Sequence, residues 1–146
     1  MPKTSQPIVV EQLLNAPAGK VWDAISRHEQ LIQWFFPQIP AFEAKVGFET
    51  RFAVESGGRT FTHVWRLLEV VPQRKIVYHW SYEEFEGAGT VCFEILPRNT
   101  QSLLRLTNEG LENFPQHIPE FSRQSCLAGW QYFIEGQLRQ YLEGDK

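Results

Sequence analysis

The chain has 146 residues, of which 14 are basic and 17 are acidic, so its formal net charge is −3. A chain of this length fits one domain, which we expect to span residues 1–146 and to bury roughly 68–70% of its unfolded surface. No predicted face carries a cluster of lysine or arginine residues, which argues against nucleic acid and anionic membranes as main partners. No apolar run approaches the ~18 residues of a membrane span, and residues 1–7 lack the apolar stretch of a signal peptide.

The N-terminal part of the chain predicts one strand and two short helices. Residues Ile8–Leu14 are rich in β-forming side chains and end just before Pro17. Proline favours the first position of a helix, and apolar residues on one face follow it, so we expect a short helix from Pro17. A second short helix is expected at Glu29–Phe35, where Pro37 prevents its continuation.

The middle of the chain predicts an antiparallel meander. Apolar and polar residues alternate along five segments, and glycine, proline or asparagine residues separate them. The five strands are expected at residues 48–55, 60–70, 75–82, 90–95 and 104–108. In the strand at 60–70 both faces carry apolar side chains, so its inward face stays open between the set of Phe61, His63 and Trp65 and the set of Thr62 and Val64, and a bulge could occur.

The chain is expected to end in a long helix from Ser122 to Glu143. Its apolar residues recur on one helical face, and Gly129 and Gly136 lie seven residues apart, hence on nearly the same side. Because glycine costs about 1 kcal/mol relative to alanine inside a helix, we expect something to approach the helix closely there. Aromatic residues make up 14% of the chain, which fits a large core or an aromatic-lined cavity about equally well. We expect the cavity to lie against the face that bears Gly129 and Trp130.

The segment Gly110–Phe121 connects the last strand to this helix. It contains Pro115 and Pro119 and shows no periodicity. We expect a loop with few buried contacts that borders the cavity mouth and acts as its lid.

Short motifs in a fixed order cover nearly the whole chain. They are Asn15-Ala16-Pro17, Val21-Trp22-Asp23-Ala24, Gln33-Trp34-Phe35 with Pro37, Val46-Gly47-Phe48, Leu68-Glu69-Val70 before Pro72, Ile76-Val77-Tyr78-His79-Trp80, Leu104-Arg105-Leu106-Thr107-Asn108-Glu109-Gly110 and Gly129-Trp130. With the order of elements, they resemble the START-like (SRPBCC) superfamily and, within it, the group named after the activator of the heat-shock protein 90 ATPase. The resemblance implies an α+β helix-grip fold, in which a curved antiparallel sheet of about six strands surrounds a long C-terminal helix, and a hydrophobic pocket.

Two positions depart from the pattern of similar sequences. Trp65 stands where glycine is common, and Asn108 stands where histidine is common. Trp65 would narrow the cavity if it points inward, and Asn108 removes a titrating group. A histidine-based mechanism at Asn108 is thereby in doubt.

From the inner faces we interpret the protein as a non-catalytic domain that binds a small hydrophobic or aromatic molecule between the sheet and the C-terminal helix. Tyr78 and Asn108, with His63 if it faces inward, would orient the polar end of the ligand. The predicted ligand-binding residues are Phe52, His63, Trp65, Tyr78, Trp80, Phe93, Leu106, Asn108, Trp130 and Phe133.

Two alternatives stay open beside ligand binding. One is a co-chaperone-like module that acts through its surface on a heat-shock ATPase, motivated by the resemblance. The other is an enzyme of the cyclase or aromatase kind, which would need a working acid–base pair such as His63 and Tyr78 in the pocket. We expect these two residues instead to be an ordinary buried histidine and a cross-strand tyrosine.

No motif predicts a metal site or a cofactor. The four histidines have no spacing that places two on one face of an element, and Gly87-Ala88-Gly89 lacks the third glycine of a dinucleotide fingerprint. Cys92 and Cys126 lie far apart in sequence and fit reduced cysteines in a cytoplasmic protein.

Overall fold

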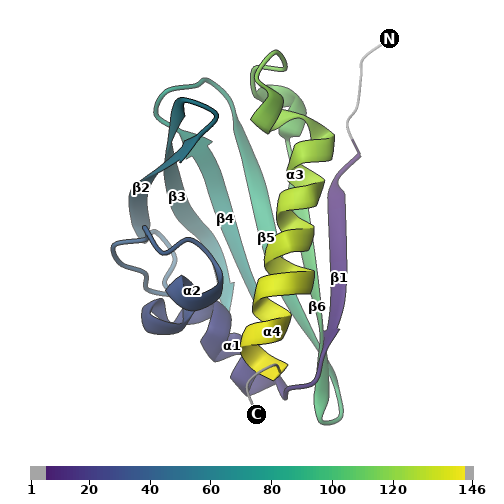
Figure 1. Ribbon diagram of the computed structural model, residues 1–146. Helices are drawn as coiled ribbons and strands as arrows, with labels where there is room; N and C mark the ends of the chain where they lie inside the picture. The colour runs from purple at the N-terminus through teal and green to yellow at the C-terminus, as the bar shows by residue number, and fades with distance from the viewer. Residues whose placement is uncertain (1–5, 144–146) are drawn as a thin grey trace.

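The computed structural model describes residues 6–143 and contains one six-stranded antiparallel sheet (Figure 1). Its strand order is β1-β6-β5-β4-β3-β2, so β2 to β6 form a meander and β1 pairs with the last strand. The strands are β1 (Ile8–Leu14), β2 (Glu49–Ser56), β3 (Arg59–Val71), β4 (Lys75–Tyr82), β5 (Ala88–Arg98) and β6 (Gln101–Glu109).

The helices occupy one face of this sheet. The short helices α1 (Ala18–Ser26) and α2 (His28–Trp34) follow β1, and Pro17 stands directly before α1 as its N-cap. The C-terminal helix runs diagonally across the sheet from α3 (Arg123–Trp130) to α4 (Arg139–Glu143) (Figure 1). The Ser122 side chain caps its start by accepting a hydrogen bond from the Ser125 amide. The α+β helix-grip arrangement that the sequence predicts is therefore confirmed.

A bulge in β3 decides which of its faces points inward. The pairing of β3 with β4 shifts between Leu67 and Glu69, so that Leu68 is an extra residue. An extra residue exchanges the two faces of a strand. Because of it, Phe61, His63, Trp65 and Leu67 are buried before the bulge, and Val70 packs against the core after it.

The middle of the C-terminal helix is not α-helical. Residues Gln131–Leu138 form a π-helix, whose turns hold more residues than an α turn. Two residues seven apart therefore no longer share a side: Gly129 borders a pocket, whereas Gly136 is exposed. An ideal Cβ built on either glycine meets no atom within 4 Å, so the expected close approach to the helix is wrong for both.

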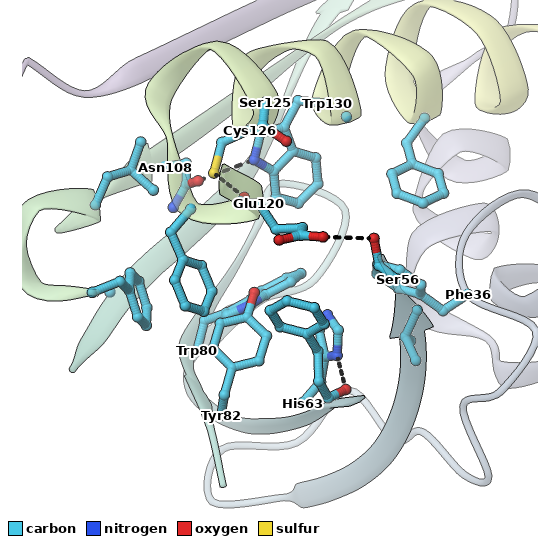
Figure 2. A pocket seen from close by; sticks show the side chains of 18 of the residues that line it. Phe36, Ser56, His63, Trp80, Tyr82, Asn108, Glu120, Ser125, Cys126 and Trp130 are labelled. Atoms are coloured by element: carbon cyan, nitrogen blue, oxygen red, sulfur yellow. Dashed lines mark hydrogen bonds between the residues drawn. The ribbon is translucent and has the colours of Figure 1, made fainter. Parts of the chain in front are cut away.

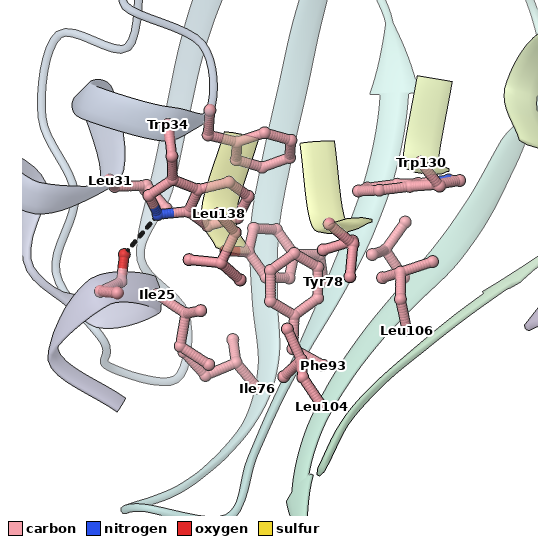
Figure 3. Close-up of a cluster of buried hydrophobic side chains, with 14 of the residues drawn as sticks. Ile25, Leu31, Trp34, Ile76, Tyr78, Phe93, Leu104, Leu106, Trp130 and Leu138 are labelled. Carbon is pink, nitrogen blue, oxygen red and sulfur yellow. Dashed lines mark hydrogen bonds between the residues drawn. The ribbon is translucent and has the colours of Figure 1, made fainter. Parts of the chain in front are cut away.

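Most of the core lies between the sheet and the three helices. Figure 3 shows Trp34 of α2, Tyr78 and Phe93 of the sheet and Leu138 of the C-terminal helix in one apolar cluster. The Trp34 indole donates a hydrogen bond to the Ala24 carbonyl (2.8 Å), which joins α2 to α1. This core fixes one end of the C-terminal helix against the sheet.

The segment between β6 and the C-terminal helix forms a second, smaller cluster. It contains two short 3₁₀ turns, Leu111–Asn113 and Pro119–Phe121. Phe114, Ile118 and Phe121 pack with Phe61 of β3, and all four are buried. The expectation that this segment has few buried contacts is wrong, because three of its apolar side chains anchor it to the sheet.

Candidate functional site

A pocket of about 300 Å³ lies between the sheet and the first turns of α3 (Figure 2). The ends of β2, β3 and β4 form one wall, α3 forms the opposite wall, and the segment after β6 borders it through Leu111, Phe114 and Phe121. Gly129 borders this space, and a Cβ added there would meet no atom within 4 Å. Phe133 and Trp130 continue the same wall along the helix.

Half of the predicted ligand-binding residues line the pocket. They are His63, Trp80, Asn108, Trp130 and Phe133.

The other half lies elsewhere, in the main core. These residues are Phe52, Trp65, Tyr78, Phe93 and Leu106. They do not line the pocket, because Phe35, directly after α2, inserts between the sheet and the C-terminal helix. Its ring stacks on Trp65, with centroids 5.5 Å apart. Phe35 thereby fills space that the sequence pattern assigns to a ligand.

Several lining residues were not predicted as ligand-binding. The clearest is Tyr82, which stands opposite His63 in the pairing of β3 with β4, their ring centroids 4.8 Å apart. Tyr78 instead stands opposite Leu67. The polar partner of His63 in the pocket is therefore Tyr82 and not Tyr78. Tyr82 shares the inward face of β4 with Tyr78 and Trp80, which was the available sequence signal.

His63 lies in an aromatic surrounding. Its ring stacks on Phe52, with centroids 4.8 Å apart and an interplanar angle of 12°, and lies 4.9 Å from the ring of Phe36. Burial lowers the pKa of His63 to about 4, although the hydrogen bond to the Phe61 carbonyl and the charge of Glu84 raise it. The imidazole is consequently neutral at pH 7.

Two hydrogen bonds hold the tryptophans of the pocket wall. The Trp80 indole donates to the Tyr82 hydroxyl (2.8 Å), and the Trp130 indole donates to Asn108 Oδ1 (3.1 Å). The Asn108 amide nitrogen in turn donates to the Thr90 carbonyl. Both polar atoms of Asn108 thus have protein partners, and its structural role is to position Trp130.

A polar bridge crosses one side of the pocket. Glu120 accepts hydrogen bonds from Ser56 (3.1 Å) and Arg59 (3.3 Å), which joins the segment after β6 to the β2–β3 hairpin (Figure 2). Cys126 also lines the pocket, and burial raises the pKa of its thiol to about 11. That thiol is therefore protonated and a poor nucleophile at pH 7.

Two polar atoms in the main core have no hydrogen-bond partner among the described residues. They are Trp65 Nε1 and the Tyr78 hydroxyl, on rings whose centroids lie 5.0 Å apart. An unpaired buried polar group costs about 1–3 kcal/mol of stability.

We expect Tyr78→Phe to leave the free energy of unfolding unchanged or to raise it by about 1 kcal/mol, because the lost hydroxyl has no partner. The matched variant is Tyr82→Phe, which removes the acceptor of the Trp80 indole and should lower stability by about 1 kcal/mol. Urea unfolding of both variants and the wild type measures the difference. A loss above 1 kcal/mol for Tyr78→Phe would instead reveal a bonded hydroxyl.

Within residues 6–143, no group of three or more histidine, cysteine or acidic side chains could hold a metal ion. In the same part of the chain, no helix combines the length and apolar character needed to cross a membrane. Cys92 and Cys126 are both free.

Comparison with known proteins shows the family. A sequence profile described as Activator of Hsp90 ATPase homolog 1-like protein matches residues 15–143, which is most of the chain. The chain belongs to this family. The resemblance to the START-like (SRPBCC) superfamily and to its group of Hsp90 ATPase activator homologues is thereby confirmed. No curated protein sequence matches the chain significantly.

Solved structures share this fold along nearly the whole chain. A protein from Chromobacterium violaceum is 24% identical, with a TM-score of 0.79 over 95% of this chain and 98% of that one. DynU16, from the dynemicin biosynthetic locus, is 20% identical, with a TM-score of 0.75 over 97% of this chain and 49% of that one. The Aha1 dimer from Colwellia psychrerythraea is 15% identical, with a TM-score of 0.69 over 95% of this chain and 97% of that one. At these identities the likeness establishes the fold alone.

Proposed function

We propose that the protein binds a small hydrophobic or aromatic molecule in the pocket between the sheet and α3. The observation that supports this most directly is the open space at Gly129, in a pocket of about 300 Å³ whose walls are mostly aromatic. Ligand pockets typically measure roughly 300–1,000 Å³, so this one suits a molecule of one or two rings. A ligand would gain apolar contact there without displacing a side chain.

The chemistry of the pocket favours binding over acid–base catalysis. A general base works best when its pKa lies near the operating pH, and burial lowers the pKa of His63 to about 4. Burial raises the pKa of Tyr82 far above neutrality. Both groups therefore suit hydrogen bonding to a ligand better than proton transfer.

We assign ligand entry to the side of the pocket that Glu120 bridges. The segment after β6 borders the pocket there, and its bonds to Ser56 and Arg59 join it to the hairpin. For the segment to act as a lid, these polar contacts and the packing of its buried apolar side chains on Phe61 would both have to separate. The free cysteines are compatible with a cytoplasmic location.

Gly129→Leu is expected to abolish binding of 2-methoxynaphthalene, a neutral two-ring probe, without destabilising the protein. The new side chain would occupy the empty space at Gly129, and replacing a helical glycine by leucine should raise stability by about 0.5–1 kcal/mol. Isothermal titration calorimetry measures the binding, and thermal unfolding measures the stability.

Gly136→Leu is the matched control for this test. It is the same substitution in the same long helix, but at an exposed position with no atom near the added Cβ. It should bind the probe as the wild type does. If the wild type binds no aromatic probe, or if Gly129→Leu binds as well as Gly136→Leu, this pocket is not the ligand site.

A further inference from the structure

We infer that His63 and Tyr82 select a ligand that carries an uncharged hydroxyl group on an aromatic ring, as in a phenol or naphthol. The inference rests on the proposed function and specifies the polar end of the ligand.

The hydrogen bond to the Phe61 carbonyl determines which His63 nitrogen carries the proton. His63 Nδ1 lies 3.0 Å from this carbonyl oxygen, which can only accept. In the neutral imidazole Nδ1 is therefore protonated, and Nε2 carries a lone pair. No described residue forms a second hydrogen bond with this ring, so Nε2 is an acceptor open to a ligand donor. In Figure 2 the ring points from its strand toward the helix side of the pocket.

The bond from Trp80 similarly determines the role of Tyr82. Trp80 Nε1 is a donor only, so the Tyr82 hydroxyl is the acceptor of their 2.8 Å hydrogen bond. The hydroxyl proton of Tyr82 has no acceptor among the described residues. Tyr82 therefore offers a donor to the pocket.

These two groups stand next to each other. His63 and Tyr82 are directly opposite in the pairing of β3 with β4, and their ring centroids are 4.8 Å apart. A hydroxyl group can donate one hydrogen bond and accept another. One hydroxyl on a ligand could thus donate to His63 Nε2 and accept from Tyr82, whereas an ether or a hydrocarbon leaves the histidine acceptor unpaired.

The charges of the pocket disfavour an ionised ligand. Among the described lining residues there is no lysine or arginine, and the one carboxylate, Glu120, is already paired with Arg59. A carboxylate or phosphate on the ligand would lose its hydration without gaining a cation. The hydroxyl is therefore expected to bind in its neutral form.

The test compares 2-naphthol with 2-methoxynaphthalene, which has the same rings but no hydroxyl proton. We expect the wild type to bind 2-naphthol about tenfold more tightly, as the one hydrogen bond donated to His63 would give. His63→Phe should remove this preference, so that the two probes bind about equally, because phenylalanine can still stack on Phe52 but offers no acceptor. His63→Gln, which restores an acceptor oxygen, should recover part of the preference.

A spectroscopic measurement on the wild-type protein keeps the test independent of variant folding. With ¹⁵N-labelled histidine, the free protein should show an unprotonated Nε2 and a protonated Nδ1 for His63, and 2-naphthol should shift the Nε2 resonance more than 2-methoxynaphthalene does. Equal affinities for the two probes, or a proton on Nε2, would overturn the inference and leave ligand binding itself intact. If neither probe binds, the proposed function fails as well.

Discussion

Phe93→Ala should lower the free energy of unfolding by about 3–5 kcal/mol, the usual cost of truncating a fully buried phenylalanine to alanine. The Phe93 ring is 0% exposed and lies near Trp34 of α2, Tyr78 of β4 and Trp130 of α3, at centroid distances of 6.3, 5.7 and 6.1 Å. It therefore links the sheet to both α2 and α3. Equilibrium unfolding in urea measures the loss.

The control for Phe93→Ala is Tyr132→Ala, in the C-terminal helix. Tyr132 is 59% exposed, so its truncation should change stability by no more than about 0.5 kcal/mol. At a temperature where Phe93→Ala is folded, it should still bind the aromatic probe, because Phe93 lies outside the pocket wall. A loss of binding with little loss of stability would instead support the sequence-based assignment of Phe93 to the ligand site.

Protonation of His63 alone should lower the free energy of unfolding of the wild type by up to about 3 kcal/mol as the pH decreases from 7 to below 4. The pKa of His63 is about 4 in the folded state, and histidine has a pKa of about 6.5 when unfolded. Between these values the unfolded chain binds a proton that the folded protein does not. The contribution is therefore complete above pH 6.5 and is lost as the pH falls through 4.

His63→Phe isolates this effect from the titration of carboxylates. The unfolding free energy of the wild type minus that of His63→Phe should decrease by up to about 3 kcal/mol toward acidic pH, since the variant lacks the proton-binding group. Among the charged groups near His63, Glu84 favours protonation, and the neighbouring rings of Phe52, Phe36 and Tyr82 exclude water. His117→Gln, at an exposed histidine, should keep the wild-type pH dependence because His63 is unchanged. Parallel profiles for wild type and His63→Phe would show that His63 is hydrated in the folded protein.

The order and type of the elements could be predicted from sequence patterns. The first strand is confirmed at Ile8–Leu14, and the second short helix begins one residue earlier than the predicted Glu29. The buried side chains Trp130, Ile134 and Leu138 confirm the apolar face of the C-terminal helix. These predictions succeed because hydrophobic periodicity and proline positions act locally.

The candidate site could be predicted only in part. The alternation of side chains along the strands and the helix predicts that His63, Trp80 and Trp130 point inward, and all three line the pocket. The same pattern does not show whether an inward aromatic residue lies in the pocket wall or in the packed core. The ring of Phe35 decides this for Trp65, because it fills the space beside Trp65 and leaves no room there for a ligand. Its position depends on how α2 packs against the sheet.

The sequence alone determined that an alternating meander and a long amphipathic helix would enclose an aromatic interior, because these periodicities and turn residues are properties of neighbouring positions. Tertiary structure decided which residues meet inside. The bulge at Leu68 places His63 opposite Tyr82, since one extra residue exchanges the faces of a strand. The π-helical turns separate the sides of Gly129 and Gly136, because such turns hold more residues than the α-helical period assumes.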